Sequence, residues 1–152
     1  MKRALTLTLF ALLSAASAAC DRPIFDRPGP LLERRNPAVA PTNLRVLGSI
    51  AGGRSRPEIR MSVTVRQQLT DSGLTVLPKS GRWESQLQAV RDVCARTEAP
   101  ALDGVLFVFY NRLELYDCDS ERAAYEISGG NLGINQMADR LVSYLKQSSA
   151  GD

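Results

Sequence analysis

The sequence predicts an α/β domain, with a mixed five-stranded sheet and three helices. Two observations support this fold class. Short apolar runs alternate with segments in which apolar residues recur at helical spacing, and the last three apolar runs are separated by turns alone. The predicted element order is therefore β-α-β-α-β-β-β-α. Two right-handed crossovers followed by hairpins give the strand order 2-1-3-4-5.

The first strand is expected at residues 44–50, before a glycine-rich loop. Ser55 and Glu58 then form a capping box with proline in the first turn, which predicts a helix that runs to Asp71. Its buried side would carry three apolar residues at helical spacing: Met61, Val65 and Leu69. Residues 59–65 also alternate, so a strand is the competing interpretation there. The cap and a glycine stop favour the helix.

A strand at 74–77 and a helix at about 84–97 come next. The helix is expected to bury one stripe of side chains: Trp83, Leu87, Val90 and Cys94. Residues 105–110 are nearly all apolar, as in a strand that is covered on both faces. Strands at 113–117 and 123–128 complete an antiparallel meander.

The chain is expected to close with a helix at 133–146 and a disordered tail at 148–152. One face of that helix carries five apolar residues: Ile134, Met137, Ala138, Leu141 and Leu145. This face would cover the same sheet, so residues 43–147 are expected to form a single α/β domain. A chain of 152 residues also has the usual length of one domain.

Residues 1–19 are interpreted as a secretory signal peptide. Lys2 and Arg3 precede a short apolar run, and small residues lie at the cleavage point. The run is too short to span a bilayer, which takes about 20 residues. The protein is therefore expected to be exported, to the periplasm or another extracytoplasmic compartment. Residues 20–42 are rich in proline and are interpreted as a semi-rigid tether outside the sheet and helices.

Cys20 follows two alanines and resembles the end of a bacterial lipoprotein signal, where the cysteine becomes the lipidated N-terminus. The usual pattern has leucine three residues before the cysteine, and this chain has Ser17 there. Cysteine parity favours lipidation, because a modified Cys20 leaves Cys94 and Cys118 as a pair. The alternative is cleavage by ordinary signal peptidase and free secretion. We expect a lipid anchor in a membrane.

The same two cysteines are expected to form a disulfide. The helix at 84–97 and the strand at 113–117 should both finish at one end of the sheet, which places Cys94 near Cys118. Cys94 also lies on the helical stripe that faces the sheet. An exported protein folds in an oxidising compartment, where such a pair is stable.

Several catalytic classes are excluded or disfavoured. The chain contains no histidine, the commonest general base and neutral metal ligand. Residues 48–55 resemble the phosphate-binding P-loop, but Arg54 replaces its lysine. Asp117, Asp119 and Glu121 are spaced like the start of a calcium loop whose glycine is missing. A flexible glycine loop and a polar turn are the preferred interpretations. We expect no enzyme activity, cofactor or metal.

One end of the predicted sheet collects basic residues, beside a helix start and at the point where the strand order reverses. Such a place is the usual ligand crevice in these sheets. The residues expected to bind an anion there are Gly53, Arg54, Ser55, Lys79 and Arg112. The opposite end collects acidic residues: Asp71, Glu98, Asp103, Asp117, Asp119 and Glu121. Solvated charges without a partner are the alternative. No nucleic acid is expected, since exposed aromatic residues do not interleave with the basic ones.

A family resemblance follows from the exported, proline-rich lead and the β-α-β-α-β core. The matching stretches are 44–50, 67–77 and 103–106, and the likeness spans roughly residues 43–146. The chain resembles bacterial envelope lipoproteins of the curli-secretion and penicillin-binding-protein-activator group, and the N-terminal domain of TolB-like proteins. The resemblance implies an envelope scaffold or activator that binds other proteins and catalyses nothing.

The sequence thus favours a non-enzymatic envelope domain that is anchored through Cys20 and acts by contacts with envelope proteins or with a second copy of itself. The second hypothesis is a binding module for an anionic small molecule, glycan or lipid headgroup in the basic crevice. These two hypotheses differ in where the functional surface lies.

Overall fold

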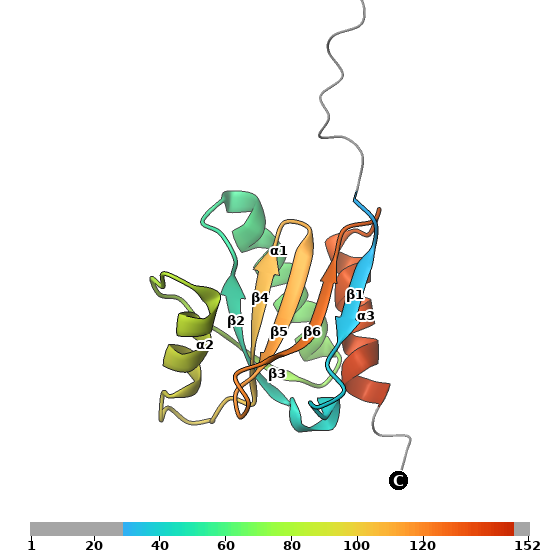
Figure 1. The fold of residues 1–152 in the computed structure, drawn as a ribbon. Helices are drawn as coiled ribbons and strands as arrows, with labels where there is room; N and C mark the ends of the chain where they lie inside the picture. The colour runs from blue at the N-terminus through green and yellow to red at the C-terminus, as the bar shows by residue number, and fades with distance from the viewer. Residues whose placement is uncertain (1–28, 148–152) are drawn as a thin grey trace, which may run out of the picture.

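The computed structural model describes residues 29–147. One sheet and three α-helices make up this part of the chain (Figure 1). A short 3₁₀ helix, Pro41–Asn43, joins the first two strands. The strands and α-helices follow in chain order: β1 (Leu32–Arg35), β2 (Val46–Ala51), α1 (Arg56–Asp71), β3 (Thr75–Pro78), α2 (Gln86–Cys94), β4 (Gly104–Phe109), β5 (Arg112–Asp117), β6 (Ala123–Ser128) and α3 (Ile134–Lys146).

The α/β class and the mixed sheet are confirmed, but the predicted strand count is wrong. The sheet has six strands in the order β1-β6-β5-β4-β2-β3. β2 pairs in parallel with β3 and β4, whereas the remaining pairs are antiparallel. The five predicted strands have the neighbours that were expected. The additional strand, β1, lies at the β6 edge and comes from the segment that was predicted to stay outside the sheet.

β1 can pair because its residues are free of proline. Pro30 and Pro37 flank the strand, and residues 32–35 keep every backbone N–H. Their register with β6 runs from Leu32 opposite Ser128 to Arg35 opposite Tyr125. The high proline content of residues 20–42 therefore did not indicate that four of these residues, 32–35, can join the sheet.

A cluster of charged side chains fastens β1 to the rest of the domain. The Glu33 carboxylate accepts hydrogen bonds from Arg35, at 2.8 Å, and from Arg140 of α3, at 2.9 Å. The Tyr125 hydroxyl donates to the same carboxylate at 3.1 Å. The hydrogen bond from Arg35 is the main reason that the pKa of Glu33 lies below its ordinary value.

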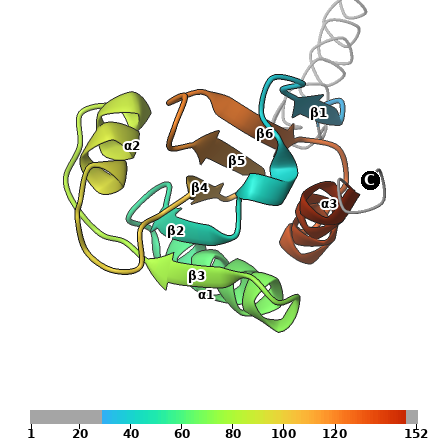
Figure 2. The ribbon, with the colours of Figure 1, turned by 90° about the horizontal axis from the view of Figure 1, so that it is seen from below.

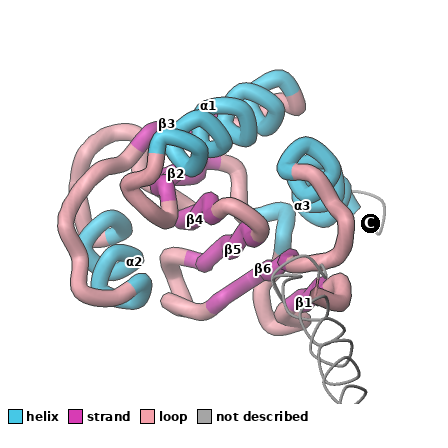
Figure 3. The backbone as a smooth tube through the Cα atoms, turned by 90° about the horizontal axis from the view of Figure 1, so that it is seen from above, coloured by secondary structure: helices cyan, strands magenta, loops and turns pink. Residues whose placement is uncertain are grey.

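The helices cover the sheet unequally: α1 and α3 lie on one face and α2 on the other (Figures 2 and 3). β4 contributes side chains to the core on each face of the sheet. Leu106 and Val108 belong to the larger core, and Val105 and Phe107 belong to the smaller one. All four side chains are buried, as predicted for a strand covered on both faces. On the α2 face, Tyr116 of β5 still packs against the smaller core, whereas no residue of β6 or β1 belongs to that core.

The first predicted helix is confirmed over the competing strand. Ser55 caps α1, because its hydroxyl accepts from the Glu58 N–H at 3.3 Å and donates to the Glu58 carboxylate at 2.7 Å. Val65 and Leu69 of this helix are fully buried. α3 likewise buries four of its five predicted residues, all but the half-buried Ile134.

The predicted stripe of the second helix is confirmed for Val90 and Cys94, which pack in the smaller core, but it is wrong for Leu87. α2 begins only at Gln86, after the cap residue Ser85, so Trp83 precedes the helix. Leu87 is 41% exposed, and the buried side chains of α2 are Ala89, Val90 and Val93. Trp83 nevertheless packs against the same core from the loop before the helix.

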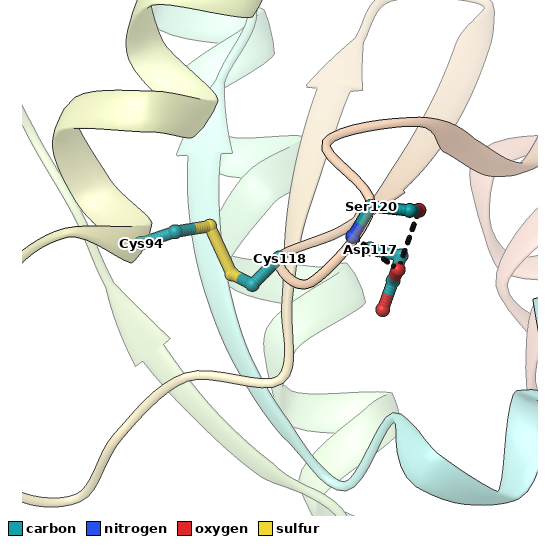
Figure 4. The surroundings of a disulfide bond; sticks show 4 residues. All are labelled: Cys94, Asp117, Cys118 and Ser120. Carbon is teal, nitrogen blue, oxygen red and sulfur yellow. Dashed lines mark hydrogen bonds between the residues drawn. A yellow bond between two sulfur atoms is a disulfide. The ribbon is translucent and has the colours of Figure 1, made fainter.

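The predicted disulfide is confirmed between Cys94, the last residue of α2, and Cys118, just after β5 (Figure 4). Their Cα atoms are 5.5 Å apart. Beside it, the Asp117 carboxylate accepts from the Ser120 N–H at 2.8 Å and from its hydroxyl. Asp117 therefore folds a polar turn. Among residues 29–147, no helix is long and apolar enough to cross a membrane.

Candidate functional site

A cavity of about 770 Å³ opens where β2 and β4 end and the β3–α2 loop begins. Five segments line it: the loop after β2, the first turns of α1, the β3–α2 loop with the start of α2, the end of β4 and the start of β5. This position matches the crevice expected from the strand order. Its lining residues that matter for chemistry are Arg54, Lys79, Arg82, Trp83, Gln86, Phe107, Phe109 and Arg112.

Two aromatic rings of the cavity rest on glycines. A Cβ atom on Gly52 would lie 2.1 Å from the Phe109 ring, and one on Gly81 would lie 2.4 Å from the Trp83 ring. Any larger residue at either position would push its ring aside. The glycines thus allow Phe109 and Trp83 to pack closely against the backbone beside the cavity.

Arg112 is held in place from two sides. Its guanidinium lies over the Phe109 ring, 4.3 Å from the ring centroid, and its Nε lies 3.0 Å from the Glu114 carboxylate. Glu114 is buried and also accepts a hydrogen bond from Gln86 of α2. The Arg112 guanidinium is therefore fixed over the Phe109 ring and paired with the Glu114 carboxylate.

Lys79 lines the cavity, but its charge is already paired. The ammonium lies 3.3 Å from the Glu98 carboxylate, and the side chain is only 12% exposed. The stem passes close to Gly48 of β2, where a Cβ atom would approach it to 3.2 Å. Glu98, which was expected at the acidic end, thus neutralises one of the predicted anion-binding residues.

The start of α1 also has an internal anion. The Glu58 carboxylate lies against Gly53, so closely that a Cβ atom there would come within 2.0 Å of it. Ser55 uses its hydroxyl for the helix cap and is not among the cavity residues. Gly53 does line the cavity. The Glu58 carboxylate therefore already occupies the start of α1, where an anion would otherwise be favoured. An anionic ligand in the cavity would have to pair with basic side chains instead.

Arg54 and Arg82 complete the cationic part of the site. Both are exposed and line the cavity. Among residues 29–147, neither forms an ion pair or a side-chain hydrogen bond. These two arginines come from different loops, one after β2 and one after β3. They are the cations of the cavity that are available to a bound anion.

Four of the five predicted anion-binding residues line one cavity: Gly53, Arg54, Lys79 and Arg112. Sequence reasoning did not assign Trp83, Phe109 or Gln86 to the site. Trp83 lies two residues after Gly81, and this spacing could have indicated a ring that packs on the backbone. Phe109 and Gln86 gave no such sign, because each looked like a regular strand or helix residue.

The opposite end of the sheet uses its acidic residues internally. The Asp103 carboxylate accepts from the backbone N–H groups of Arg45, at 2.9 Å, and Val46, at 2.7 Å. Glu121 pairs with Arg91 of α2 at 2.7 Å. Within the described part of the chain, no group of three histidine, cysteine or acidic residues could hold a metal ion. Cys20, the predicted lipidation site, lies outside the described residues.

Comparisons with known proteins give a distant likeness. No family model and no curated protein match the chain. Among solved structures it is similar to the PelC dodecamer from Paraburkholderia phytofirmans, with 13% identity, a TM-score of 0.44, and coverage of 76% of this chain and 93% of that one. A variant of the same protein matches at 15% identity and a TM-score of 0.44, covering 77% of this chain and 95% of that one. This similarity is too low to assign a function.

Proposed function

We propose that the protein is an exported, lipid-anchored domain of the cell envelope that binds, without catalysis, a ligand with both an anionic group and a ring. The observation that supports this most is the cavity itself. Arg54, Arg82 and the fixed Arg112 surround it together with Trp83 and Phe109. The structure therefore favours the second hypothesis from the sequence over the first.

The charge preference follows from the unpaired arginines. A guanidinium presents several N–H donors in one plane, which suits carboxylate, phosphate and sulfate groups. Arg112 is held by Phe109 and paired with Glu114, so the charge preference rests on the two unpaired arginines. Such a cluster at the mouth of a cavity favours anionic ligands over neutral ones.

The ring preference follows from the aromatic side chains of the cavity. Phe109 packs between Gly52 and the Arg112 guanidinium, and Trp83 packs closely against Gly81, so Trp83 is the ring proposed to stack on a ligand. A ring that stacks on Trp83 gains apolar burial and aromatic contact energy. The volume, about 770 Å³, is in the range of sites for small molecules.

Binding without catalysis is proposed because Glu114, the buried carboxylate beside the cavity among residues 29–147, is already used, and Glu84 of the lining is exposed. Glu114 pairs with Arg112 and accepts from Gln86, so its oxygens are occupied by the protein. The chain has no histidine to act as a base. Export is supported by the signal-like lead and by the disulfide, which is stable in an oxidising compartment. The lipid anchor on Cys20 belongs to this proposal.

The single tryptophan of the chain, Trp83, provides the test, because its fluorescence reports on the cavity alone. Phenyl phosphate is titrated into the protein and into the Arg54→Ala/Arg82→Ala variant. We expect saturable fluorescence change with the parent protein and an affinity at least roughly tenfold lower for the variant, since hydrogen bonds to charged groups are each worth about 1.5–3 kcal/mol. Inorganic phosphate should bind more weakly than phenyl phosphate.

The matched control is Arg96→Ala/Arg122→Ala, which removes the same charge from exposed positions away from the cavity. Its affinity should equal that of the parent protein. Equal affinity in both double variants, or no saturable change at all, would refute the proposal.

Protein contact is the second candidate function, and the sheet itself favours it. The side of β6 and β1 opposite α1 and α3 carries Glu126 and Arg34, which lie outside the smaller core that α2 forms with β4 and β5. An envelope protein or a second copy of this chain could dock there. Cross-linking in intact membranes through residues placed on this face would recover that partner if contact is the main function.

A further inference from the structure

The exposed side of α1 carries an unusual stripe. Arg56, Ile59, Arg60 and Val63 follow one another at the spacing i, i+3, i+4, i+7, so they share one face of the helix. Ile59 and Val63 are each 50% exposed. Neither arginine forms an ion pair within residues 29–147. We call these four residues the α1 stripe.

The α1 stripe is not required by folding. The core side of the helix is formed by Ser62, Val65 and Leu69, which are buried and lie on the opposite face. Ile59 lines the edge of the site cavity, yet it and Val63 each keep half of their surface in solvent between unpaired arginines. A basic helix face with apolar residues is typical of attachment to a membrane surface.

The described chain enters the domain next to this helix. Gly29 and Met61 of α1 line one small cavity together with Tyr110, whose side chain is 67% exposed. The Gly130 N–H donates to the Gly29 carbonyl at 2.7 Å, which fixes the entry point. Figure 1 shows β1 and α1 both starting at the same end of the sheet. Chain entry, the exposed tyrosine and the α1 stripe therefore occupy one end of the molecule.

The distance to a lipid anchor is short. Nine residue steps separate Cys20 from Gly29. Because an extended chain advances at most about 3.3–3.6 Å per residue, Gly29 lies within roughly 30 Å of an anchor on Cys20. A lipid there would keep the entry end close to the bilayer and leave the acidic end farther away.

We propose that the α1 stripe docks on an anionic lipid bilayer. Arg56 and Arg60 would lie among acidic headgroups, and Ile59 and Val63 would enter the boundary between headgroups and acyl chains. This contact goes beyond the cavity function and uses different arginines. It shares the lipid anchor and Ile59 with the proposed function; the anchor is removed in the test below, and Ile59 is left unchanged.

The test uses the exported chain with Cys20→Ser and vesicles of phosphatidylglycerol mixed with phosphatidylcholine, or of phosphatidylcholine alone. We expect sedimentation with the anionic vesicles only. The Arg56→Ala/Arg60→Ala variant should bind about twenty-five-fold more weakly, since each arginine near an anionic surface contributes roughly a fivefold factor. Val63→Ser alone should also weaken binding relative to the Cys20→Ser chain. Because it removes apolar contact and no charge, the salt dependence of binding should not change.

Arg96→Ala/Arg122→Ala, with the same change in net charge, is the matched control and should bind like the parent chain. The Trp83 response to phenyl phosphate should persist in the Arg56→Ala/Arg60→Ala variant, which shows an intact fold and separates this inference from the cavity function. Equal losses in the two double variants, or no preference for anionic vesicles, would overturn the proposal.

Discussion

The two ends of the sheet use charged residues in opposite ways. At the end where β2 and β4 begin, Asp103, Asp117 and Glu121 each hold a backbone or side-chain donor in place. At the end where these strands finish, four arginines have no carboxylate partner among residues 29–147: Arg54, Arg56, Arg60 and Arg82. The first set stabilises loops, whereas the second remains available for binding.

The difference also shows why charge counts alone mislead. Lys79 and Arg112 belong to the basic end by position, yet Glu98 neutralises the first and Glu114 fixes the second. Position at one end of the sheet therefore does not decide whether a charge is used in folding; its contacts do. Function is expected at the end whose charges folding does not use.

The largest effect on stability should come from Asp103→Ala at the structural end. This change leaves the N–H groups of Arg45 and Val46 without their anionic acceptor. We expect a loss of about 2 kcal/mol in the free energy of unfolding, because hydrogen bonds to charged groups are worth about 1.5–3 kcal/mol. Urea denaturation measures it, and the affinity for phenyl phosphate should not change.

Asp119→Ala is the control for that variant. Asp119 lies in the β5–β6 turn and makes no hydrogen bond or ion pair among residues 29–147. Its stability should stay within about 0.5 kcal/mol of the parent protein. Equal destabilisation by both changes would mean that the carboxylates at this end act only through net charge.

A smaller effect is expected for Glu33→Gln, which breaks the cluster that holds β1. Hydrogen bonds from Arg35 and Arg140 lower the pKa of Glu33 from its ordinary value of 4.5. A lowered pKa in the folded state stabilises the protein above the unfolded-state pKa, and this contribution disappears as the pH falls through the lower, folded-state value. Glu33→Gln should therefore be less stable than the parent at neutral pH, and the difference should shrink below pH 4.5.

Denaturation at several pH values measures this, with Glu126→Gln as the control. Glu126 pairs only with the exposed Arg34, at 3.7 Å, so its loss should cost little. A constant difference between Glu33→Gln and the parent down to acid pH would contradict the assigned role of Glu33.

The sequence was sufficient where a feature depends on local chemistry. Ser55 with Glu58 predicted the start of α1, and the near-continuous apolar run predicted the buried β4. The disulfide followed from topology, since the two cysteines come from elements that finish at one end of the sheet. β1 was missed because composition averages over a segment, whereas pairing needs only four residues without proline.

The candidate site was predictable in position but not in detail. Arg54 could be placed at the strand ends from topology alone. The pairing of Lys79 with Glu98 could not, because the loop after α2 folds back toward β3. The Glu58 carboxylate against Gly53 and the Trp83 ring against Gly81 also depend on side-chain directions, which the sequence pattern does not specify.

The most direct test of the difference between the two ends is an NMR titration of isotope-labelled protein with phenyl phosphate. Each backbone amide and the Trp83 indole report separately on binding. We predict that the resonances of Gly52, Gly53, Arg54 and Trp83 shift and saturate together, while those of Asp103 and Asp117 stay fixed. Shifts centred on the Asp103 end, or spread evenly over both ends, would contradict the account.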